Sequence, residues 1–149
     1  MEKKIINAVR VYLIKAGKIV VIKYKASNNG YYDIPGGKIE GDETADEASI
    51  REFKEETGMT VVKQHHIGHY NIEYPDRIYK MKIFIVDEYI GEPMDLTKNK
   101  AMWVDISDIE NKTNVFSTIR VIRYLKDGMS IKIKCDNNHK ILEISEMEK

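Results

Sequence analysis

The chain lacks the features that mark secreted and membrane proteins. Cys135 is its single cysteine, so no internal disulfide can form and a cytoplasmic location is the default expectation. No run of about 18 apolar residues occurs, so no membrane-spanning helix is expected. The N-terminal stretch MEKKIINAVRVYLIK has neither the apolar run nor the cleavage site of a signal peptide.

A surplus of charge and a linker are also missing. The 24 basic and 24 acidic side chains balance, so no bulk field favours nucleic acid or an anionic membrane as a partner. No repeat, low-complexity tract or Pro/Ser-rich stretch interrupts the chain. Its 149 residues, 42% hydrophobic and 32% charged, are ordinary for one globular unit. We therefore expect a single domain over 1–149.

The N-terminal part has the pattern of a β-hairpin followed by a loop. Apolar and polar residues alternate over 7–14 and over 18–24, and Ala16-Gly17 between them favours a tight turn. The next stretch, 25–42, is rich in glycine and asparagine and also contains a proline, so a loop is expected there.

Two helices and several further strands are predicted beyond residue 42. The first helix should begin between Asp42 and Thr44 and end at Thr57, with Gly58 as the left-handed residue that follows it. A second helix is predicted over 116–128, closed by Gly128. Strands are expected at 60–63, 66–74, 78–89 and 101–106, with a terminal hairpin at 130–144. This order indicates an α/β sandwich rather than a repeating βαβ fold.

The first predicted helix gathers acidic residues on one face. At 100° per residue, Glu52, Glu55 and Glu56 fall within an arc of roughly 100°. The rest of that face is small, which would let a loop or a polyphosphate approach closely, and the opposite face is apolar and should point to the core. The small residues are Ala45, Ala48 and Ser49, and the apolar ones are Ile50 and Phe53.

Such a cluster of carboxylates favours a bound cation. Two carboxylates about 4 Å apart repel by about 1 kcal/mol in water and by about 4 kcal/mol at an effective dielectric constant near 20. Partial burial would force protonation unless a divalent ion compensates the charge. Oxygen ligands without a thiolate or an obvious imidazole favour Mg²⁺ and allow Mn²⁺. The simpler alternative is a solvated helix face held by salt bridges, such as Arg51 with Glu55.

The spacing of the whole segment resembles a known motif. The stretch GGKIEGDETADEASIREFKEETGM places Gly37, five residues, Glu43, seven residues, and then REFKEETGM. This resembles the Nudix box, Gly-x5-Glu-x7-Arg-Glu-U-x-Glu-Glu-x-Gly-U with U bulky and apolar, and all seven fixed positions match. IPGGKIE, YPDR and GEP, followed by Trp103, are similar to the MutT-type nucleoside triphosphate pyrophosphohydrolases of the Nudix hydrolase family.

The resemblance implies a fold and an activity. The fold would be a Nudix-type α/β/α sandwich around a mixed β-sheet, with the box at 37–59. The resemblance covers roughly 5–126, so a β-hairpin at about 129–145 would be a C-terminal addition. The activity would be metal-dependent hydrolysis of a nucleoside diphosphate linked to a group X. In the MutT-type subgroup, a nucleoside triphosphate gives a monophosphate and pyrophosphate.

Roles follow from the position of each residue in the motif. The metal set would be the Gly37 carbonyl with Glu52, Glu55 and Glu56. Glu52 would orient or deprotonate the attacking water, with Glu55 as the alternative, and Lys38 could reach a substrate phosphate. The residues that would support the loop and the helix are Gly36, Glu43, Arg51 and Gly58.

Substrate recognition is less clearly marked. Arg77 and Asn114 match the positions where the MutT-type subgroup recognises its purine, although they could equally be a turn residue and a helix-end residue. Candidates for stacking on a base, each of which could instead be core or rim, are Tyr31, Tyr32, Tyr74 and Trp103. The subgroup's further acidic ligand falls on Thr97, where Asp95, Glu92 or Glu88 could substitute.

Several alternatives stay open on sequence alone. His65, His66 and His69 suggest a zinc site only weakly, because no thiolate accompanies them. The terminal hairpin could cover the sheet edge or form a homodimer contact. The small nucleotide substrate could be an ordinary or oxidised nucleoside triphosphate, ADP-ribose, a dinucleoside polyphosphate or a capped RNA end. A non-catalytic nucleotide sensor is a further alternative.

Overall fold

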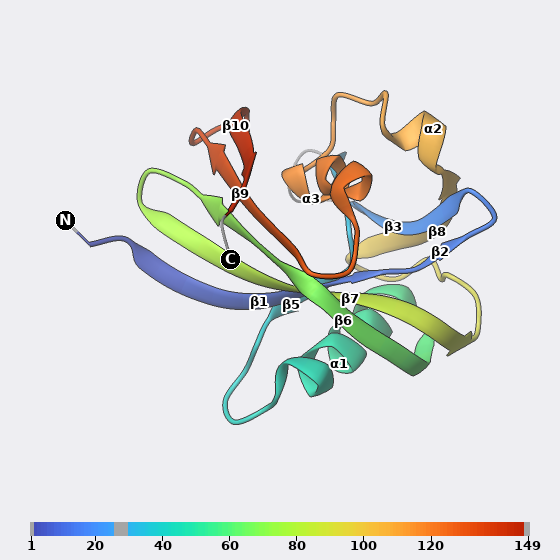
Figure 1. Ribbon diagram of the computed structural model, residues 1–149. Coiled ribbons are helices and arrows are strands. Elements are labelled where there is room, and N and C mark those ends of the chain that lie inside the picture. The colour runs from blue at the N-terminus through green and yellow to red at the C-terminus, as the bar shows by residue number, and fades with distance from the viewer. Residues whose placement is uncertain (1, 26–29, 148–149) are drawn as a thin grey trace.

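The computed structural model describes residues 2–25 and 30–147, and Figure 1 shows its arrangement. The strands are β1 Lys4–Tyr12, β2 Ile14–Lys15, β3 Lys18–Tyr24, β4 Tyr32–Asp33, β5 Gly36–Lys38, β6 Thr60–Glu73, β7 Arg77–Ile90, β8 Asn99–Asp105, β9 Met129–Cys135 and β10 Ile141–Glu146. The helices are α1 Ala45–Thr57, α2 Ile106–Ile109, α3 Ser117–Arg120 and the 3₁₀ helix η2 Val121–Tyr124. None of these helices has the length and apolar character needed to span a bilayer.

Two sheets form the centre of the molecule. The larger has the order β10-β9-β6-β7-β1-β5 and is mixed, since β1 runs parallel to β7 and β9 runs parallel to β6. The smaller joins β2, β3 and β4, with β8 on β3. In Figure 1, α1 covers one face of the larger sheet, and α2, α3 and the smaller sheet lie on the other side. The predicted α/β/α sandwich is confirmed.

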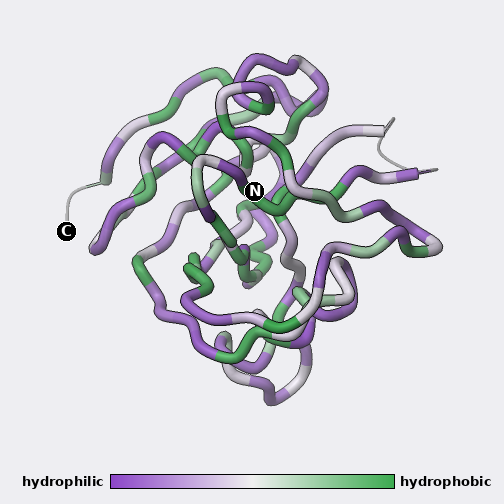
Figure 2. Tube along the Cα trace, turned by 90° about the vertical axis from the view of Figure 1, so that its right-hand side faces the viewer, coloured by the Kyte–Doolittle hydropathy of each residue, from purple (hydrophilic) through white to green (hydrophobic). Residues whose placement is uncertain are grey.

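The main core fills the space between the larger sheet, the smaller sheet and α3. Fully buried side chains such as Tyr12 and Tyr70 meet there, and their hydroxyl oxygens are 3.1 Å apart. A second cluster around Phe53 packs α1 onto the opposite face of the sheet. In Figure 2 short hydrophobic stretches alternate with hydrophilic ones along the chain, as strands buried on one face require.

The predicted N-terminal hairpin is wrong in its pairing. Ala16 and Gly17 do form a turn, with φ of 51° and 76°, but only the two residues of β2 precede it in the ladder with β3. β1 instead pairs with β7 and β5 in the larger sheet. Alternation identifies strands but not their partners. β1 is buried on both faces at Ala8-Val9 and Val11-Tyr12, which suits a strand flanked on both sides.

The predicted loop at 25–42 contains two short strands. β4 pairs with β3, and β5 pairs with β1 through Gly36 and Gly37. A Cβ on Gly36 would lie 2.1 Å from the carbonyl oxygen of Val9, so only glycine lets β5 approach β1 this closely. Strands of two or three residues are too short for periodicity to reveal. Residues 26–29 of this stretch lie outside the described residues.

Of the other predicted helices and strands, some are confirmed and some are wrong. The first helix is confirmed, with Thr44 as its N-cap and Gly58 in the left-handed region at its end, and the terminal hairpin is confirmed as β9 and β10. The strands expected at 60–63 and 66–74 are one strand, β6, with bulges. The second helix is wrong in length, because α3 and η2 end at Tyr124.

The predictions about the faces of α1 are each right in part. Ala48 and Ser49 are fully buried, and Ala48 packs with Val9, Phe84 and Ile39, so the sheet and the loop after β5, not a polyphosphate, approach the small side chains. Ile50 is 41% exposed, whereas Phe53 is buried as expected.

Candidate active site

The acidic face of α1 is fixed by the caps of the helix and by its packing. Thr44 and Glu47 form a reciprocal capping box at the start, in which Thr44 Oγ1 accepts from the Glu47 N–H and Glu47 Oε1 accepts from the Thr44 N–H. Fully buried Phe53 anchors the middle of the helix. The helix contacts β5 and β1, which brings its glutamates against the paired glycines.

Two carboxylates lie directly on the Gly36-Gly37 strand. The Gly36 N–H donates to Glu56 Oε1 at 2.8 Å. A Cβ on Gly37 would lie 2.5 Å from the carboxyl carbon of Glu52, so that carboxylate occupies the space that any side chain would fill. The predicted meeting of the glycine turn with Glu52 and Glu56 is therefore what the structure shows.

Burial makes these two carboxylates reluctant to ionise. It raises the pKa of Glu56 to about 8, although the Gly36 N–H and the Arg10 guanidinium oppose the shift. Burial also raises the pKa of Glu52, against the lowering effect of Arg51. Glu55 differs, because its side chain is 57% exposed. A proton or a bound cation would relieve the cost of the buried negative charge.

Arg51 holds the acidic residues together. Its Nε donates to Glu43 Oε2 at 3.0 Å, its Nη1 donates to Glu52 Oε1 at 2.9 Å, and its Nη2 donates to the Lys38 carbonyl at 3.2 Å. Nη1 also lies 3.2 Å from Glu55. The hydrogen bonds from Arg51 lower the pKa of Glu43 to about 2. The supporting role of Glu43 and Arg51 in the site stays a prediction.

The donor set fits a magnesium ion that keeps most of its water. In the part of the chain that the structure describes, no three His, Cys, Asp or Glu side chains form a ready-made metal site. Magnesium, however, usually takes only one or two carboxylates from the protein and fills its shell with water and substrate phosphate. The partly buried oxygens of Glu52 and Glu56, beside the Gly37 backbone, supply that number, and burial raises the pKa of both carboxyls despite Arg51 and Arg10 nearby.

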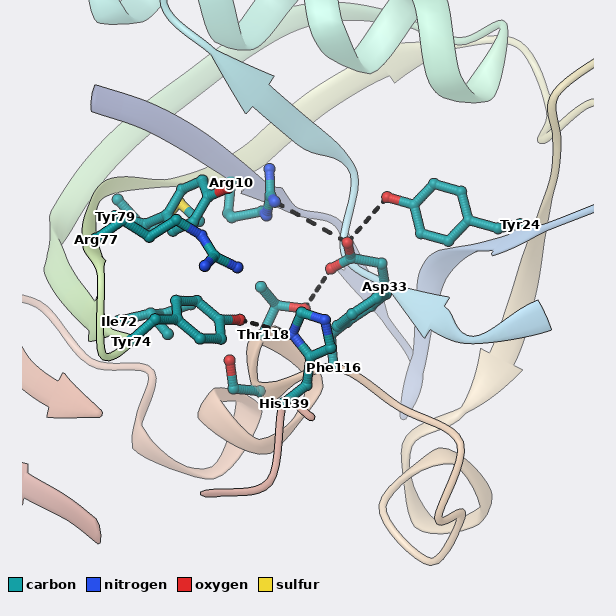
Figure 3. Close-up of a pocket in the computed structure, with 12 residues that line it drawn as sticks. Arg10, Tyr24, Asp33, Ile72, Tyr74, Arg77, Tyr79, Phe116, Thr118 and His139 are labelled. Carbon is teal, nitrogen blue, oxygen red and sulfur yellow. Dashed lines mark hydrogen bonds and ion pairs between the residues drawn. The ribbon is translucent and has the colours of Figure 1, made fainter. Parts of the chain in front are cut away.

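A cavity of about 200 Å³ opens near this acidic face. Asp33 lies at one side of it, as Figure 3 shows, and its carboxylate accepts from the Tyr24 hydroxyl at 3.0 Å, from the Ile34 N–H at 2.8 Å and from the Thr118 hydroxyl. The cavity is lined by Arg10, Tyr24, Asp33, Ile72, Tyr74, Arg77, Tyr79, Met81, Phe116, Ser117, Thr118 and His139.

Arg10 connects the cavity to the glutamates. Its Nη1 lies 2.7 Å from the point where a Cβ on Gly36 would be. The N–H of Gly36 in turn donates to Glu56. The guanidinium is buried, its nearest carboxylate, Asp33, is 3.9 Å away, and its Nε has no hydrogen-bond partner within the described residues. A buried cation with so few partners is suited to an anionic or carbonyl-bearing ligand.

Comparison with known proteins identifies the family. Residues 4–125 match the model of the NUDIX domain family. The chain belongs to this family. It is 31% identical to an "oxidized purine nucleoside triphosphate hydrolase" of Danio rerio, over 66% of this chain and 65% of that protein. It is 33% identical to an "8-oxo-dGTP diphosphatase" of Haemophilus influenzae, over 49% of this chain and 54% of that protein.

The chain thus spans between about half and two thirds of the length of these NUDIX relatives. Its fold is similar to that of a MutT protein from Bacillus halodurans, with a TM-score of 0.78 and 16% identity over 95% of this chain and 97% of that one. Because so little of the chain is left out, this structural match extends into the C-terminal hairpin. The predicted resemblance to MutT-type NUDIX proteins is confirmed.

The structure places the remaining candidate residues in different surroundings. Tyr74 and Arg77 both line the cavity, with the Arg77 guanidinium 4.1 Å from the centre of the Tyr74 ring. Asn114 is not among the residues that line the cavity, and its side chain donates to the Gly30 carbonyl at 3.5 Å. Lys38 lies on β5 with an exposed side chain. The roles of all four in binding substrate stay predictions.

Other sequence candidates have local partners. Asp95 is paired with Lys25, and Trp103 Nε1 donates to Glu92 at 3.3 Å. The three histidines of the NUDIX domain do not converge among the described residues. His65 pairs with Asp87, His66 packs against Phe84, and His69 lies beside Ser130.

Most of the cavity carried no signal in the sequence. The residues that sequence reasoning missed come from β1, β3, β4, β6, β7, α3 and its N-cap, and the terminal hairpin, and each has an ordinary local context. They are Arg10, Tyr24, Asp33, Ile72, Tyr79, Met81, Phe116, Ser117, Thr118 and His139. An arginine within the apolar strand β1 is the one unusual feature that could have drawn attention.

Proposed function

We propose that this protein hydrolyses a nucleoside triphosphate, including oxidised purine forms, to the monophosphate and pyrophosphate, with Mg²⁺ or Mn²⁺ as cofactor. One observation carries the proposal: two partly buried carboxylates, Glu52 and Glu56, lie against Gly36-Gly37 and beside a cavity lined by arginine and aromatic side chains. The names of the NUDIX relatives support this substrate class.

The residues of the NUDIX box would have different roles in the reaction. The Gly37 carbonyl, Glu52, Glu55 and Glu56 would hold the metal, whose charge would neutralise phosphate oxygens and would lower the pKa of a bound water. Glu52 would orient the attacking water and accept its proton, because its carboxylate is half-buried beside Gly37 and fixed by Arg51. Exposed Glu55 is the alternative base.

The cavity would take one part of the nucleotide. At about 200 Å³ it is smaller than the roughly 300–1,000 Å³ of pockets that enclose a whole drug-sized ligand. A base fits this size better than a complete nucleotide. Tyr74 offers an aromatic face and Arg77 offers N–H donors to such a ring. Lys38 would contact a phosphate outside the cavity.

Other assignments are less well supported. ADP-ribose, a dinucleoside polyphosphate or a capped RNA end would use the same chemistry on a different group X. A non-catalytic sensor would not need all the box glutamates, which are present here. The single cysteine favours a cytoplasmic location, and a homodimer is compatible with the chain.

A substrate panel tests the proposal. The protein is incubated with ordinary and oxidised nucleoside triphosphates, ADP-ribose and diadenosine polyphosphates, with Mg²⁺, with Mn²⁺ and with EDTA. We expect pyrophosphate and a monophosphate from at least one triphosphate, only with metal. Release of inorganic phosphate from triphosphates, or turnover in EDTA, would contradict the proposal.

A further inference from the structure

The turn of the C-terminal hairpin reaches the cavity described above. His139, between β9 and β10, is one of the lining residues, and Figure 3 shows its ring facing the hydroxyl of Tyr74. The two are joined by a hydrogen bond of 2.9 Å between His139 Nδ1 and Tyr74 Oη. The His139 ring also packs edge-on against Phe116, with ring centres 5.0 Å apart. A residue outside the matched NUDIX region 4–125 therefore forms part of the cavity wall.

The backbone of this turn fixes the ring in place. His139 has a φ of 64°, a left-handed conformation in which histidine is enriched among the residues other than glycine. Asp136 maintains it, because its side chain accepts from the N–H groups of Asn138 at 2.8 Å and Lys140 at 3.0 Å. The turn therefore holds the His139 ring at the wall of the cavity.

The ring retains a free polar atom. Nδ1 is bonded to Tyr74, whereas Nε2 has no hydrogen-bond partner in the described ranges 2–25 and 30–147. Burial and the nearby Arg77 guanidinium lower the pKa of His139, which favours the neutral form of the ring. Asp33 lines the same cavity, but its carboxylate, unlike Nε2 of His139, already takes part in three hydrogen bonds as an acceptor.

We infer that His139 contacts the bound base and helps to determine which base is accepted. The inference rests on the proposed function, because it assumes that the cavity takes the base of a nucleotide. The base would lie in the cavity beside His139 and form a hydrogen bond with Nε2 of its ring. The C-terminal hairpin would then be a specificity element as well as a structural one.

A matched pair of variants on the same turn tests this. In His139→Asn the ring is lost, while asparagine tolerates the left-handed backbone. Lys140→Ala removes the exposed side chain next to it, which does not line the cavity. For the best triphosphate of the panel, we expect His139→Asn to raise KM about tenfold, equivalent to about 1.4 kcal/mol. Its kcat should stay within about twofold, and the KM ratio between bases should change. Lys140→Ala should change neither.

A binding measurement on the unmodified protein makes the test independent of variant folding. Guanosine, adenosine and cytidine monophosphates are added in turn, and the ring nitrogen resonances of His139 and His65 are followed by NMR. We expect those of His139 to shift with at least one nucleotide and those of His65, on the exposed part of β6, to stay unchanged.

The outcomes separate the two claims. If no nucleotide is hydrolysed or bound by the unmodified protein, the proposed function fails. If the protein is active but His139→Asn leaves KM unchanged, or if the His139 resonances do not move on binding, the inference about His139 is overturned and the proposed function stands.

Discussion

At the scale of single residues, the candidate site depends on the missing side chain of Gly37. A Cβ there would lie 2.5 Å from the carboxyl carbon of Glu52, a distance at which one of the two groups must move. In Gly37→Ala we expect the Glu52 carboxylate to be displaced, with a loss of more than about tenfold in kcat/KM, since small misplacements at a reacting centre are costly. Steady-state kinetics at fixed metal concentration measures this.

Gly41→Ala is the matched control. Its Cβ would meet no atom within 4 Å, but its φ of 51° disfavours alanine. This variant should therefore lose stability and keep its turnover, the reverse of Gly37→Ala. Equal kinetic effects in the two variants would show that Gly37 has no special relation to Glu52.

The buried carboxyl of Glu56 predicts a pH dependence of stability. Its pKa is raised from 4.5 to about 8 by burial, so the folded state binds this proton more tightly than the unfolded chain. The stabilisation of the folded state by this proton is fully present below about pH 4.5 and is lost as the pH rises toward about 8. In EDTA, the Tm of Glu56→Gln should exceed that of the unmodified protein by several degrees at the upper end of this range and equal it at the lower end.

The same variant should lose activity at every pH. A glutamine cannot supply the charge of a metal ligand, and the loss should exceed the roughly 10–100-fold typical of groups that only support a ligand. Glu143→Gln, at an exposed position of β10, is the control for both measurements. An active, metal-dependent Glu56→Gln protein would refute the assignment of Glu56.

At the scale of secondary structure elements, the sequence predicted the features that depend on residues close to one another in the chain. The position of α1 follows from its periodicity, the Thr44 cap and Gly58, all of which lie within the helix or next to it. The partner of β1 could not be predicted, because alternation over residues 7–14 is equally compatible with pairing to β3 or to β7. β5 depends on the contact of Gly36 with Val9, which only the folded sheet creates.

The candidate site shows the same difference between features that are local in the sequence and contacts that only the fold creates. The glutamates and glycines of the box lie within 24 residues of each other, so their meeting could be predicted from the motif. Arg10, Asp33 and His139 come together only because β1, β4 and the terminal hairpin are brought to one cavity. These residues are far apart in the sequence, so no local pattern indicates that they meet.

The cap of α1 can be tested as an element. Thr44→Ala removes the side-chain acceptor for the Glu47 N–H, which typically costs about 1 kcal/mol. For a chain of this size, that corresponds to a Tm lower by about 2–4 °C. Turnover at a temperature well below Tm should be unchanged, since the glutamates lie two to three turns further along the helix. A large loss of activity at an unchanged Tm would contradict this expectation.

At the scale of the whole molecule, the C-terminal hairpin belongs to the core although it lies outside the matched NUDIX region. β9 runs parallel to β6 and extends the larger sheet, and its inward residues Met129, Ile131 and Ile133 are at most 1% exposed. Each buried apolar side chain contributes about 1.5–3 kcal/mol. The three together give roughly 5–9 kcal/mol, comparable to a net stability of about 5–15 kcal/mol.

Two substitutions on the facing strands β9 and β10 test this. Ile133→Ala, at a position with 0% exposure, should lower the free energy of unfolding by about 2–5 kcal/mol, because it leaves a cavity in the main core. Leu142→Ala, at a position with 62% exposure, should lower it by no more than about 0.5 kcal/mol. Urea unfolding followed by circular dichroism measures both. If Ile133→Ala were as mild as Leu142→Ala, the hairpin would be an appendage, and its turn could not hold His139 in a fixed position at the cavity.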